Sequence, residues 1–361
     1  MLRSIRFAGA LALMGSVGLA LGEPPTAVAA DGVVVASGLA SPRHLTFSAT
    51  GALYVAEAGS GGPRGAGGNC VDHPLGLFCL GSTGAVTQVR DTGPDTRVLS
   101  GLPSIANTDE ALGPSDISLT GSQKYVLSIG IGGSLDFRDA FGAEGRELGT
   151  LVTGKLGKGT SELFADVLAN EATANPEPAD IDSNPAGIVR SGESYLIADA
   201  GGNSIVRANH KGAFTTLAVL PGVPSSFGFP ADAVPTSVVR GPDGAYYISQ
   251  LVGFPFDPQA SSIWRLVPGE APTVYATGLT NVTDLAFAPD GALFAVEIAA
   301  NGLMAGPFGD VVKITPGAST HEVVQSDLFA PYGIAFGNGA MYVTTGSVLF
   351  DSGEVVRFPM P

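Results

Sequence analysis

A unit of four short strands recurs along this chain, and the repeat constrains the fold more than any other feature of the sequence. In its clearest copy, strands are expected at residues 284–287 and 293–297, joined by a Pro-Asp-Gly turn at residues 289–291. Proline presets φ and glycine supplies the positive φ of a tight turn, so this pattern predicts a hairpin. Two further strands are expected at residues 310–315 and 322–325, before the unit begins again.

Aligning the chain on this turn gives six pairs of first and second strands. The pairs are expected at residues 44–47 and 53–57, 116–119 and 125–128, 187–189 and 195–199, 237–239 and 246–250, 284–287 and 293–297, and 333–336 and 341–344. Third strands are expected at residues 85–89, 149–153, 204–207, 262–266, 311–315 and 354–358. Outer fourth strands are expected at residues 96–99, 163–168, 214–220, 273–279 and 322–325, so the sixth copy lacks one.

The segment at residues 33–39 reads like the outer strand at residues 273–279, although it precedes the first copy. We expect it to supply the missing strand of the sixth copy, which closes a ring of radial sheets and hides a strand edge. A chain that is 45% hydrophobic and 14% charged, with 51 glycines and 26 prolines, suits turn-dense β structure around a large core. The sequence therefore predicts an all-β fold, a six-bladed β-propeller closed by the N-terminal strand completing the last blade.

Residues 1–29 are predicted to be a secretory signal peptide that precedes the propeller domain at residues 30–361. Two arginines precede an apolar run at residues 7–21, and small residues at 27–29 suit a cleavage site. The run is shorter than the roughly 20 residues of a membrane span, so we expect a cleaved, secreted protein with no membrane span after leader removal.

The expected mature chain is acidic. Its formal net charge is -16, compared with -15 for the chain that still carries the leader. Nucleic acid and anionic lipid are therefore not expected as partners, since phosphate binding requires clustered Lys and Arg. Cations, cationic ligands and neutral molecules remain open, as does the interpretation that the acidity only keeps an exported protein soluble.

Cys70 and Cys79 are the only cysteines, separated by a short loop that contains proline and glycine. An even number of cysteines in an exported chain predicts a disulfide. The alternative, half of a metal site, has only His73 nearby.

Loop length separates the two faces of the predicted propeller. Turns between strands one and two or three and four share one face and are short here, as at residues 49–51 and 242–244. The opposite, loop-rich face holds nearly all the insertions, at residues 59–84, 130–148, 253–261, 299–309, 346–353, 107–115, 170–186 and 221–235. Long loops on a rigid scaffold are typical of binding sites, so a small molecule, glycan or protein is expected there, bound by a monomer. Alternatively, the loops only cover the channel mouth.

Two rings of side chains are expected around that mouth. The second strands end at Glu57, Ile129, Asp199, Gln250, Glu297 and Thr345. The first strands begin at His44, Asp116, Gly187, Ser237, Asp284 and Gly333, with Asn184 just before the third of them. The candidate ligand-binding residues are Glu57, Asp116, Asn184, Asp199, Gln250, Asp284 and Glu297.

Carboxylates from several strands are the hard oxygen ligands that Ca²⁺ binds. The candidate calcium ligands are Glu57, Asp199, Asp284 and Glu297. The alternative is a polar channel filled by water, because Ile129, Gly187 and Gly333 interrupt the rings.

Two further features of the sequence bear on possible chemistry. Asp180, Asp182 and Asn184 alternate like the start of a calcium loop, but proline follows where glycine is required, which favours a loop leading into a strand. Of the four histidines only His44 is expected near the axis, as a candidate catalytic base or ligand. A hydrogen-bonded loop residue is the alternative for His44.

The chain resembles the ScyD/ScyE family of exported propeller-like proteins. The resemblance rests on the segments at residues 38–43, 51–59, 69–86, 125–133 and 195–203. It implies an exported propeller but carries over no catalytic residue. More distantly, the repeats are similar to NHL and gluconolactonase-type propellers.

Two functions follow from these observations. The first is a noncatalytic exported binding or scaffold module that uses the loop-rich face around the channel. The second is a calcium-dependent lactonase or esterase with His44 as its base. Fold alone does not decide between these two functions. The incomplete ligand rings favour the first.

Overall fold

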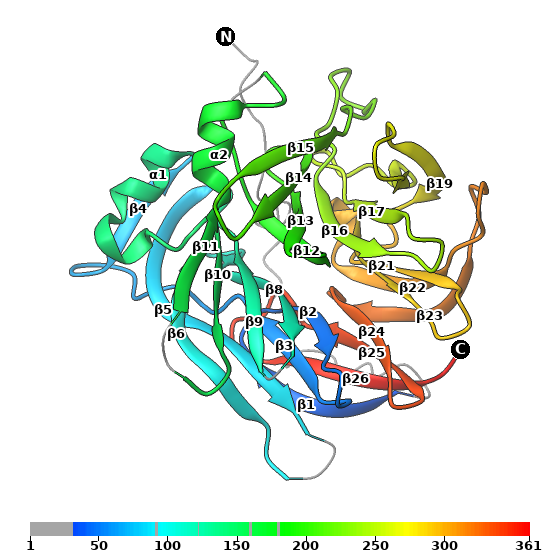
Figure 1. Cartoon of the computed structure of the whole chain (residues 1–361), viewed down its shortest axis with the longest axis horizontal. Coiled ribbons are helices and arrows are strands. Elements are labelled where there is room, and N and C mark those ends of the chain that lie inside the picture. Colours follow the sequence, from blue (N-terminus) through cyan, green and yellow to red (C-terminus); the bar gives the residue numbers. More distant parts are fainter. Residues whose placement is uncertain (1–31, 91–92, 122, 159–160, 179–180) are drawn as a thin grey trace.

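Six sheets radiate from one central axis in the computed structural model, which describes residues 32–90, 93–121, 123–158, 161–178 and 181–361 (Figure 1). The predicted signal peptide at residues 1–29 lies outside the described residues. Each sheet is antiparallel, and its first strand lies closest to the axis. The predicted six-bladed β-propeller is confirmed.

Strand order in the sheets follows the repeat of the sequence. The first blade contains β2 (Pro42–Phe47), β3 (Leu53–Glu57), β5 (Gly76–Val89) and β6 (Thr96–Ala106), with β4 (Asn69–His73) and β7 (Ala111–Leu112) added. The second contains β8 (Pro114–Thr120), β9 (Lys124–Ile129), β10 (Thr150–Lys155) and β11 (Ser161–Asp166). The third contains β12 (Pro185–Ser191), β13 (Ser194–Asp199), β14 (Ser204–Asn209) and β15 (Phe214–Val219).

The remaining blades repeat this order. The fourth contains β16 (Pro235–Arg240), β17 (Tyr246–Gln250), β18 (Ser261–Leu266) and β19 (Thr273–Leu279). The fifth contains β20 (Val282–Phe287), β21 (Leu293–Glu297), β22 (Phe308–Lys313) and β23 (Glu322–Phe329). The sixth contains β24 (Ile334–Gly337), β25 (Ala340–Thr345) and β26 (Gly353–Pro359), with β1 (Val33–Leu39) as its outer strand.

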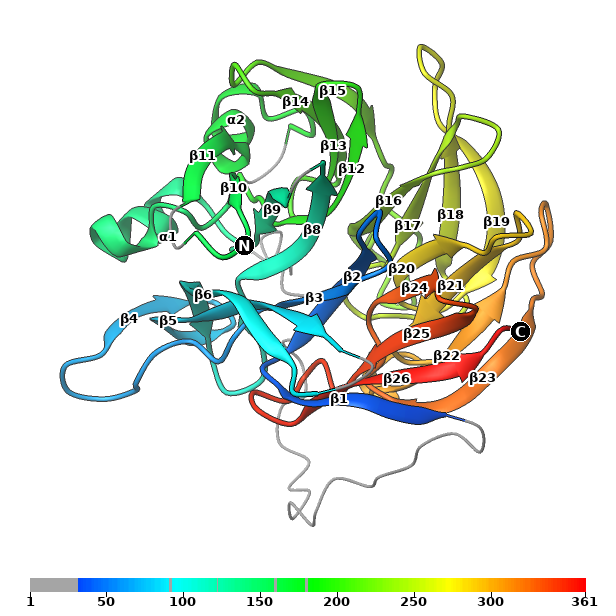
Figure 2. The ribbon, with the colours of Figure 1, turned by 60° about the horizontal axis from the view of Figure 1, so that its bottom comes forward.

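The N-terminal strand closes the ring as predicted. β1 runs antiparallel to β26, with Val34 opposite Val356, and the two strands lie side by side along the lower edge in Figure 2. Ala36 and Leu39 of β1 are buried in a cluster with residues of the first and last blades. The first blade therefore packs against a sheet made from both ends of the chain, and β26 is not left as an exposed edge.

Close packing of the first strands around the axis explains two glycines of the predicted inner ring. A Cβ on Gly187 would lie 2.7 Å from the Cα of Ser237 in the next blade. A Cβ on Gly333 would lie 2.5 Å from the carbonyl oxygen of Arg43. Both positions require glycine because neighbouring backbones approach each other there.

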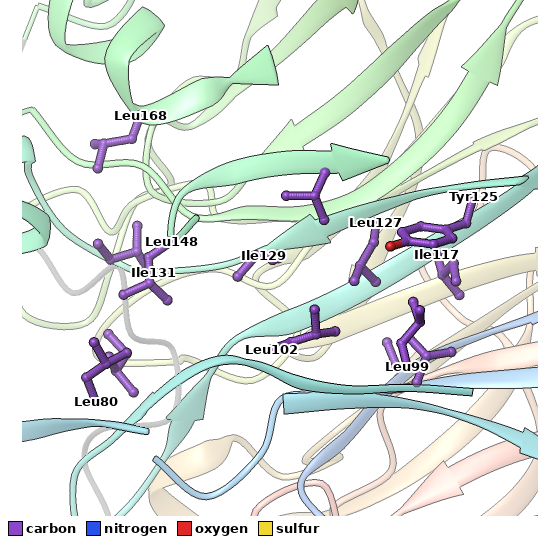
Figure 3. Packing of buried hydrophobic residues seen from close by; sticks show 14 of the residues in the cluster. Leu80, Leu99, Leu102, Ile117, Tyr125, Leu127, Ile129, Ile131, Leu148 and Leu168 are labelled. Atoms are coloured by element: carbon purple, nitrogen blue, oxygen red, sulfur yellow. The ribbon is translucent and has the colours of Figure 1, made fainter. Parts of the chain in front are cut away.

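The hydrophobic core is divided among the interfaces between blades. Between the first two blades, Leu99 and Leu102 face Ile117 and Leu127, and Figure 3 shows these side chains between the two sheets. Leu168, which belongs to a helix on the loop-rich side, extends the same cluster. Alternating apolar residues of each strand thus fill the space that the repeating sheets leave between them.

The insertions hold structure that the strand repeat did not predict. They contain α1 (Leu135–Ala140), the 3₁₀ turns η1 (Gly142–Gly145) and η2 (Leu303–Ala305), and α2 (Val167–Ala174). Asp166 accepts a hydrogen bond from the Ala169 amide at 3.0 Å, so this N-cap ends β11 two residues before the expected end at residue 168. None of the helices in the described ranges is long and apolar enough to cross a membrane.

The cysteine loop is a hairpin that projects from the first blade. β4 pairs with the beginning of β5, and Cys70 lies directly opposite Cys79. Their sulfur atoms form the predicted disulfide. His73 in the same hairpin packs between Phe78 and Phe137, which attaches the hairpin to α1.

Candidate functional site

Polar side chains from four blades meet around the axis. His44 on β2, Asp116 on β8, Ser237 on β16 and Asp284 on β20 line one cavity of about 300 Å³. Their equivalent positions near the beginning of these four first strands bring them to the same depth in the channel. The structure therefore brings together four polar residues of the predicted inner ring.

His44 presents one ring nitrogen to an acidic neighbour. Its Nδ1 lies 3.0 Å from the carbonyl oxygen of Ser115, which only accepts hydrogen bonds, so Nδ1 carries a proton. Its Nε2 is buried without a hydrogen bond and lies 3.6 Å from Asp284 Oδ1. This arrangement leaves Nε2 available to a ligand or a reacting group.

The two aspartates also join neighbouring blades. Asp284 Oδ2 accepts a hydrogen bond from the Ile334 amide at 2.9 Å, and Asp284 Oδ1 accepts one from Ser237 Oγ at 2.7 Å. Asp116 Oδ2 accepts a hydrogen bond from the Ile188 amide at 2.8 Å. Each aspartate thus binds the first strand of the following blade, which fixes its carboxylate at the axis.

Burial makes this site electrostatically unusual. It raises the pKa of Asp284 and of Asp116, while nearby His44 opposes the rise in both. The two aspartates are close enough for the charge of Asp284 to add to the raised pKa of Asp116. A bound cation would therefore interact favourably with both carboxylates.

The cavity extends away from the loop-rich face. It follows the first strands as far as Ser118, Arg190 and Arg240, close to the ends of β8, β12 and β16. Those strand ends lead into the short turns, so the cavity lies on the short-turn side of the molecule. This differs from the expectation that all inner-ring residues would face the loop-rich mouth.

A plug of buried side chains nearly fills the loop-rich end of the channel. Arg43 donates hydrogen bonds to the carbonyl oxygens of Ser347 at 2.8 Å and Ala111 at 2.7 Å. Its guanidinium stacks 4.8 Å from the centre of the Tyr332 ring. The space left at this end is about 40 Å³, enough only for water or an ion. Burial lowers the pKa of Arg43 and raises that of Tyr332, as expected for groups away from solvent.

Glu57 on the second strand of the first blade turns into its own sheet. Its side chain is fully buried and accepts hydrogen bonds from the Ala40 amide at 2.8 Å and from Thr87 Oγ1 at 2.5 Å. Arg97 on the outer strand binds both carboxylate oxygens, at 2.8 and 3.2 Å. Glu57 therefore neutralises an arginine and holds the segment that leads into β2.

The equivalent acids in the third and fifth blades also hold the segment before the first strand. Asp199 Oδ1 accepts a hydrogen bond from the Asn184 amide at 2.6 Å, and Glu297 Oε1 accepts one from the Thr280 amide at 2.7 Å. Burial raises the pKa of Asp199 to about 6 and that of Glu297 to about 7. These carboxylates cap backbone amides that would otherwise be buried without partners.

The structure does not bring the four candidate calcium ligands together. Glu57, Asp199 and Glu297 each bind within their own blade, and only Asp284 lies in the channel cavity. Within the described ranges, no group of three or more His, Cys, Asp and Glu side chains is placed to hold a metal. The physical reason is that second-strand ends face along the sheet, toward strands of the same blade, rather than toward the axis.

Two other predicted ligand residues also lie away from the cavity. Gln250 Oε1 accepts a hydrogen bond from Trp264 Nε1 at 3.2 Å, inside the fourth blade. Asn184 Oδ1 accepts one from the Ile131 amide at 3.2 Å, and Asn184 lines the small space beside Arg43.

Sequence reasoning missed the charged residues at the two ends of the channel. Arg43 directly precedes His44, and strand alternation alone would place its side chain on the opposite side of the sheet. Arg190 and Arg240 each follow a Val at the end of a first strand, in the repeated pattern Val-Arg. This repeated Val-Arg pattern is the sequence signal for the two arginines.

Comparison with known proteins gives the fold. No protein-family model matches this sequence, and no curated protein matches it. The chain is similar to two solved structures described as glucose dehydrogenase, each 12% identical, covering 91% of this chain and 99% of theirs, with TM-scores of 0.56 and 0.53. It is also similar to a putative gluconolactonase, 12% identical, covering 92% of this chain and 94% of that one, with a TM-score of 0.50.

At this level of identity the similarities show a shared propeller architecture and no activity. The resemblance to the ScyD/ScyE family is consistent with a propeller but stays a sequence-based prediction. The predicted monomeric state and a glycan or protein partner on the loop-rich face also stay predictions.

Proposed function

We propose that this chain is an exported, noncatalytic binding module whose central channel holds a small molecule carrying an ammonium group. One observation carries the proposal: two carboxylates and a histidine from three different blades line a single cavity of about 300 Å³. Export is supported by the Cys70–Cys79 disulfide, since disulfides persist in oxidising compartments.

The charge order along the cavity suits this ligand class. Asp116 and Asp284 lie at the inner end, beside the Arg43 plug, and can bind an ammonium group. Arg190 and Arg240 line the outer end, where they can bind a carboxylate. The position of His44 adds a hydrogen-bond acceptor for an ammonium proton. The cavity volume is in the range of small-molecule sites.

Four matched probes test the proposal on the purified mature protein. Butylamine, γ-aminobutyrate, butyrate and butanol differ in charge but share one chain length. We expect the two ammonium compounds to raise the melting temperature and the other two to leave it unchanged, because only the former match the inner carboxylates. Asp284→Asn and Asp116→Asn should weaken ammonium binding by about tenfold or more, the effect of one lost charge-assisted hydrogen bond.

Asp243→Asn is the control variant, because Asp243 pairs with Arg265 on the protein surface, outside the channel. Equal binding of butyrate or butanol would contradict the proposed ligand class. If Asp284→Asn and Asp116→Asn both bind the ammonium compounds as tightly as the unchanged protein, the channel is not the binding site.

A lactone or ester hydrolase is the second candidate, favoured by one observation. The hydrogen bond of His44 Nδ1 to Ser115 leaves Nε2 as a buried base without a hydrogen bond. A general base of this kind accelerates hydrolysis by about 10² to 10⁴-fold, so His44→Gln should reduce kcat by that factor. Turnover of lactones or aryl esters that His44→Gln abolishes would replace the noncatalytic proposal, and an absence of turnover would eliminate the hydrolase.

A further inference from the structure

A second acidic site lies on the loop-rich side of the third blade, away from the channel cavity. α2 places Glu171 against the loop that follows β13, close to Gly202 and to the carboxylate of Asp199. The Glu171 side chain is 2% exposed, and its Oε2 atom has no hydrogen-bond partner. A buried carboxylate oxygen without a partner is rare in folded proteins, because desolvation is not offset.

Two glycines lie directly against the acidic side chains of this site. A Cβ on Gly202 would lie 3.0 Å from Glu171 Oε2 and 3.2 Å from Asp199 Oδ2, so both oxygens lie close to the same backbone position. A Cβ on Gly201 would lie 2.7 Å from Asp182 Oδ1. The side chains of Glu171, Asp199 and Asp182 therefore all lie close to the backbone of two neighbouring glycines.

The charges at this site are not balanced in the way that the first blade balances its own. Burial, together with the neighbouring carboxylates of Asp199, Asp182 and Glu177, raises the pKa of Glu171 to about 8. In the first blade, the acid equivalent to Asp199 is Glu57, which binds the guanidinium of Arg97. Glu57 thus faces a cation, whereas Asp199 faces a second acid, Glu171.

We propose that a calcium ion binds here, with Glu171 Oε2 and Asp199 Oδ2 as its charged ligands. Two carboxylates balance a divalent charge, and Ca²⁺ accepts backbone carbonyls, hydroxyl groups and water as its remaining ligands. Neutral ligands are required because no described group of three acidic, His or Cys side chains is arranged to hold a metal. Ser183 Oγ donates a hydrogen bond to Asp199 Oδ2 at 2.8 Å, so one hydroxyl group adjoins the site.

The test measures calcium binding by the whole mature protein after treatment with a chelator. Ca²⁺ alone should bind with one ion per chain in calorimetry and should raise the melting temperature as its concentration rises. Mg²⁺ should bind more weakly, because it requires a strict octahedral ligand set. Glu171→Gln, which keeps the shape but removes the charge, should weaken Ca²⁺ binding by more than about tenfold, since calcium affinity follows the number of charged ligands.

Two further variants separate this site from the rest of the molecule. Gly202→Ala should also weaken binding, because its Cβ would lie 3.0 and 3.2 Å from the two oxygens and displace them. Glu297→Gln changes another buried acid, one that caps the Thr280 amide in the fifth blade, and should bind Ca²⁺ like the unchanged protein. Asp284→Asn should do the same, so the calcium site and the channel site fail independently.

Three results would overturn the proposal. The first is that the unchanged protein binds no Ca²⁺. The second is that Glu171→Gln binds Ca²⁺ as tightly as the unchanged protein. The third is that Asp284→Asn loses Ca²⁺ binding while Glu171→Gln keeps it. If Ca²⁺ has no effect and Glu171→Gln raises the melting temperature at alkaline pH, the buried oxygens hold a proton instead of a metal.

Discussion

Arg97 and Glu57 form an ion pair in which the carboxylate is fully buried and the guanidinium is half exposed, at 2.8 Å. The hydrogen bond to Glu57 raises the pKa of Arg97. Because Glu57 also binds the Ala40 amide, this pair connects the outer strand of the first blade to the segment between β1 and β2. The pair therefore stabilises the blade at the point where the ring closes.

Replacing Arg97 by Met should destabilise the protein by about 2 kcal/mol, because it leaves a buried carboxylate without its cation. The effect should be smaller than for a fully buried pair, since half of the Arg97 side chain reaches water. Urea denaturation measures the loss. Arg207→Met is the matched control at an exposed position of β14, and an equal loss in both variants would contradict a specific role for the pair.

Truncating Leu39 to Ala should destabilise the protein by about 2 to 4 kcal/mol, because Leu39 is buried in the cluster that joins the first and last blades. Val33→Ala in the same strand should change stability by less than about 0.5 kcal/mol, since Val33 is exposed. Thermal denaturation measures both variants. A negligible effect of Leu39→Ala would show that closure by β1 does not support the fold.

Stability should fall as pH rises from about 4.5 to about 7, in part because of Glu297. Burial raises its folded-state pKa to about 7, above the ordinary value of 4.5, so between these values the folded state holds a proton that the unfolded state has lost. At roughly 1.4 kcal/mol per pKa unit, the stability lost through Glu297 reaches about 3 kcal/mol above pH 7.

Glu297→Gln keeps the hydrogen bond to Thr280 and removes the titration. We expect it to match the unchanged protein near pH 4.5 and to exceed its stability above pH 7, in denaturation measured across that range. A pH profile identical to that of the unchanged protein would contradict the assignment of this effect to Glu297.

Removing the disulfide with Cys70→Ser and Cys79→Ser should loosen the hairpin of β4 and β5 without unfolding the blades. The short loop that it closes corresponds to about 2 to 3 kcal/mol of chain entropy, and the hairpin projects from the sheet. Hydrogen exchange should accelerate between residues 69 and 80 and remain slow in β9. Faster exchange throughout the first two blades would show that the hairpin supports more than itself.

Much of the fold was predictable because its determinants are local. Turns such as residues 289–291 and the period-two alternation of the strands specify each hairpin within a few residues. Residues 33–39 were identified as the closing strand because they resemble an outer strand in length and pattern. The helices were missed because both are short. α1 begins at a cap inside a loop, Ser134, and α2 begins at Asp166, which is also the last residue of β11.

The candidate site was predictable only in part. His44, Asp116, Ser237 and Asp284 do line one cavity, because the beginning of each first strand lies against the axis. The cavity nevertheless opens toward the short turns, since Arg43 occupies the loop-rich end.

The sequence by itself determined the repeat, the number of blades and the strand that closes the ring, because these depend on residues that are neighbours along the chain. The tertiary structure alone decided the partners of the buried acids. Glu57 forms an ion pair with Arg97, Asp284 accepts a hydrogen bond from the Ile334 amide, and Glu171 lies beside Asp199. The alternation of a strand fixes which side of the sheet a side chain takes, but the charge that it meets there comes from distant segments that only packing brings together.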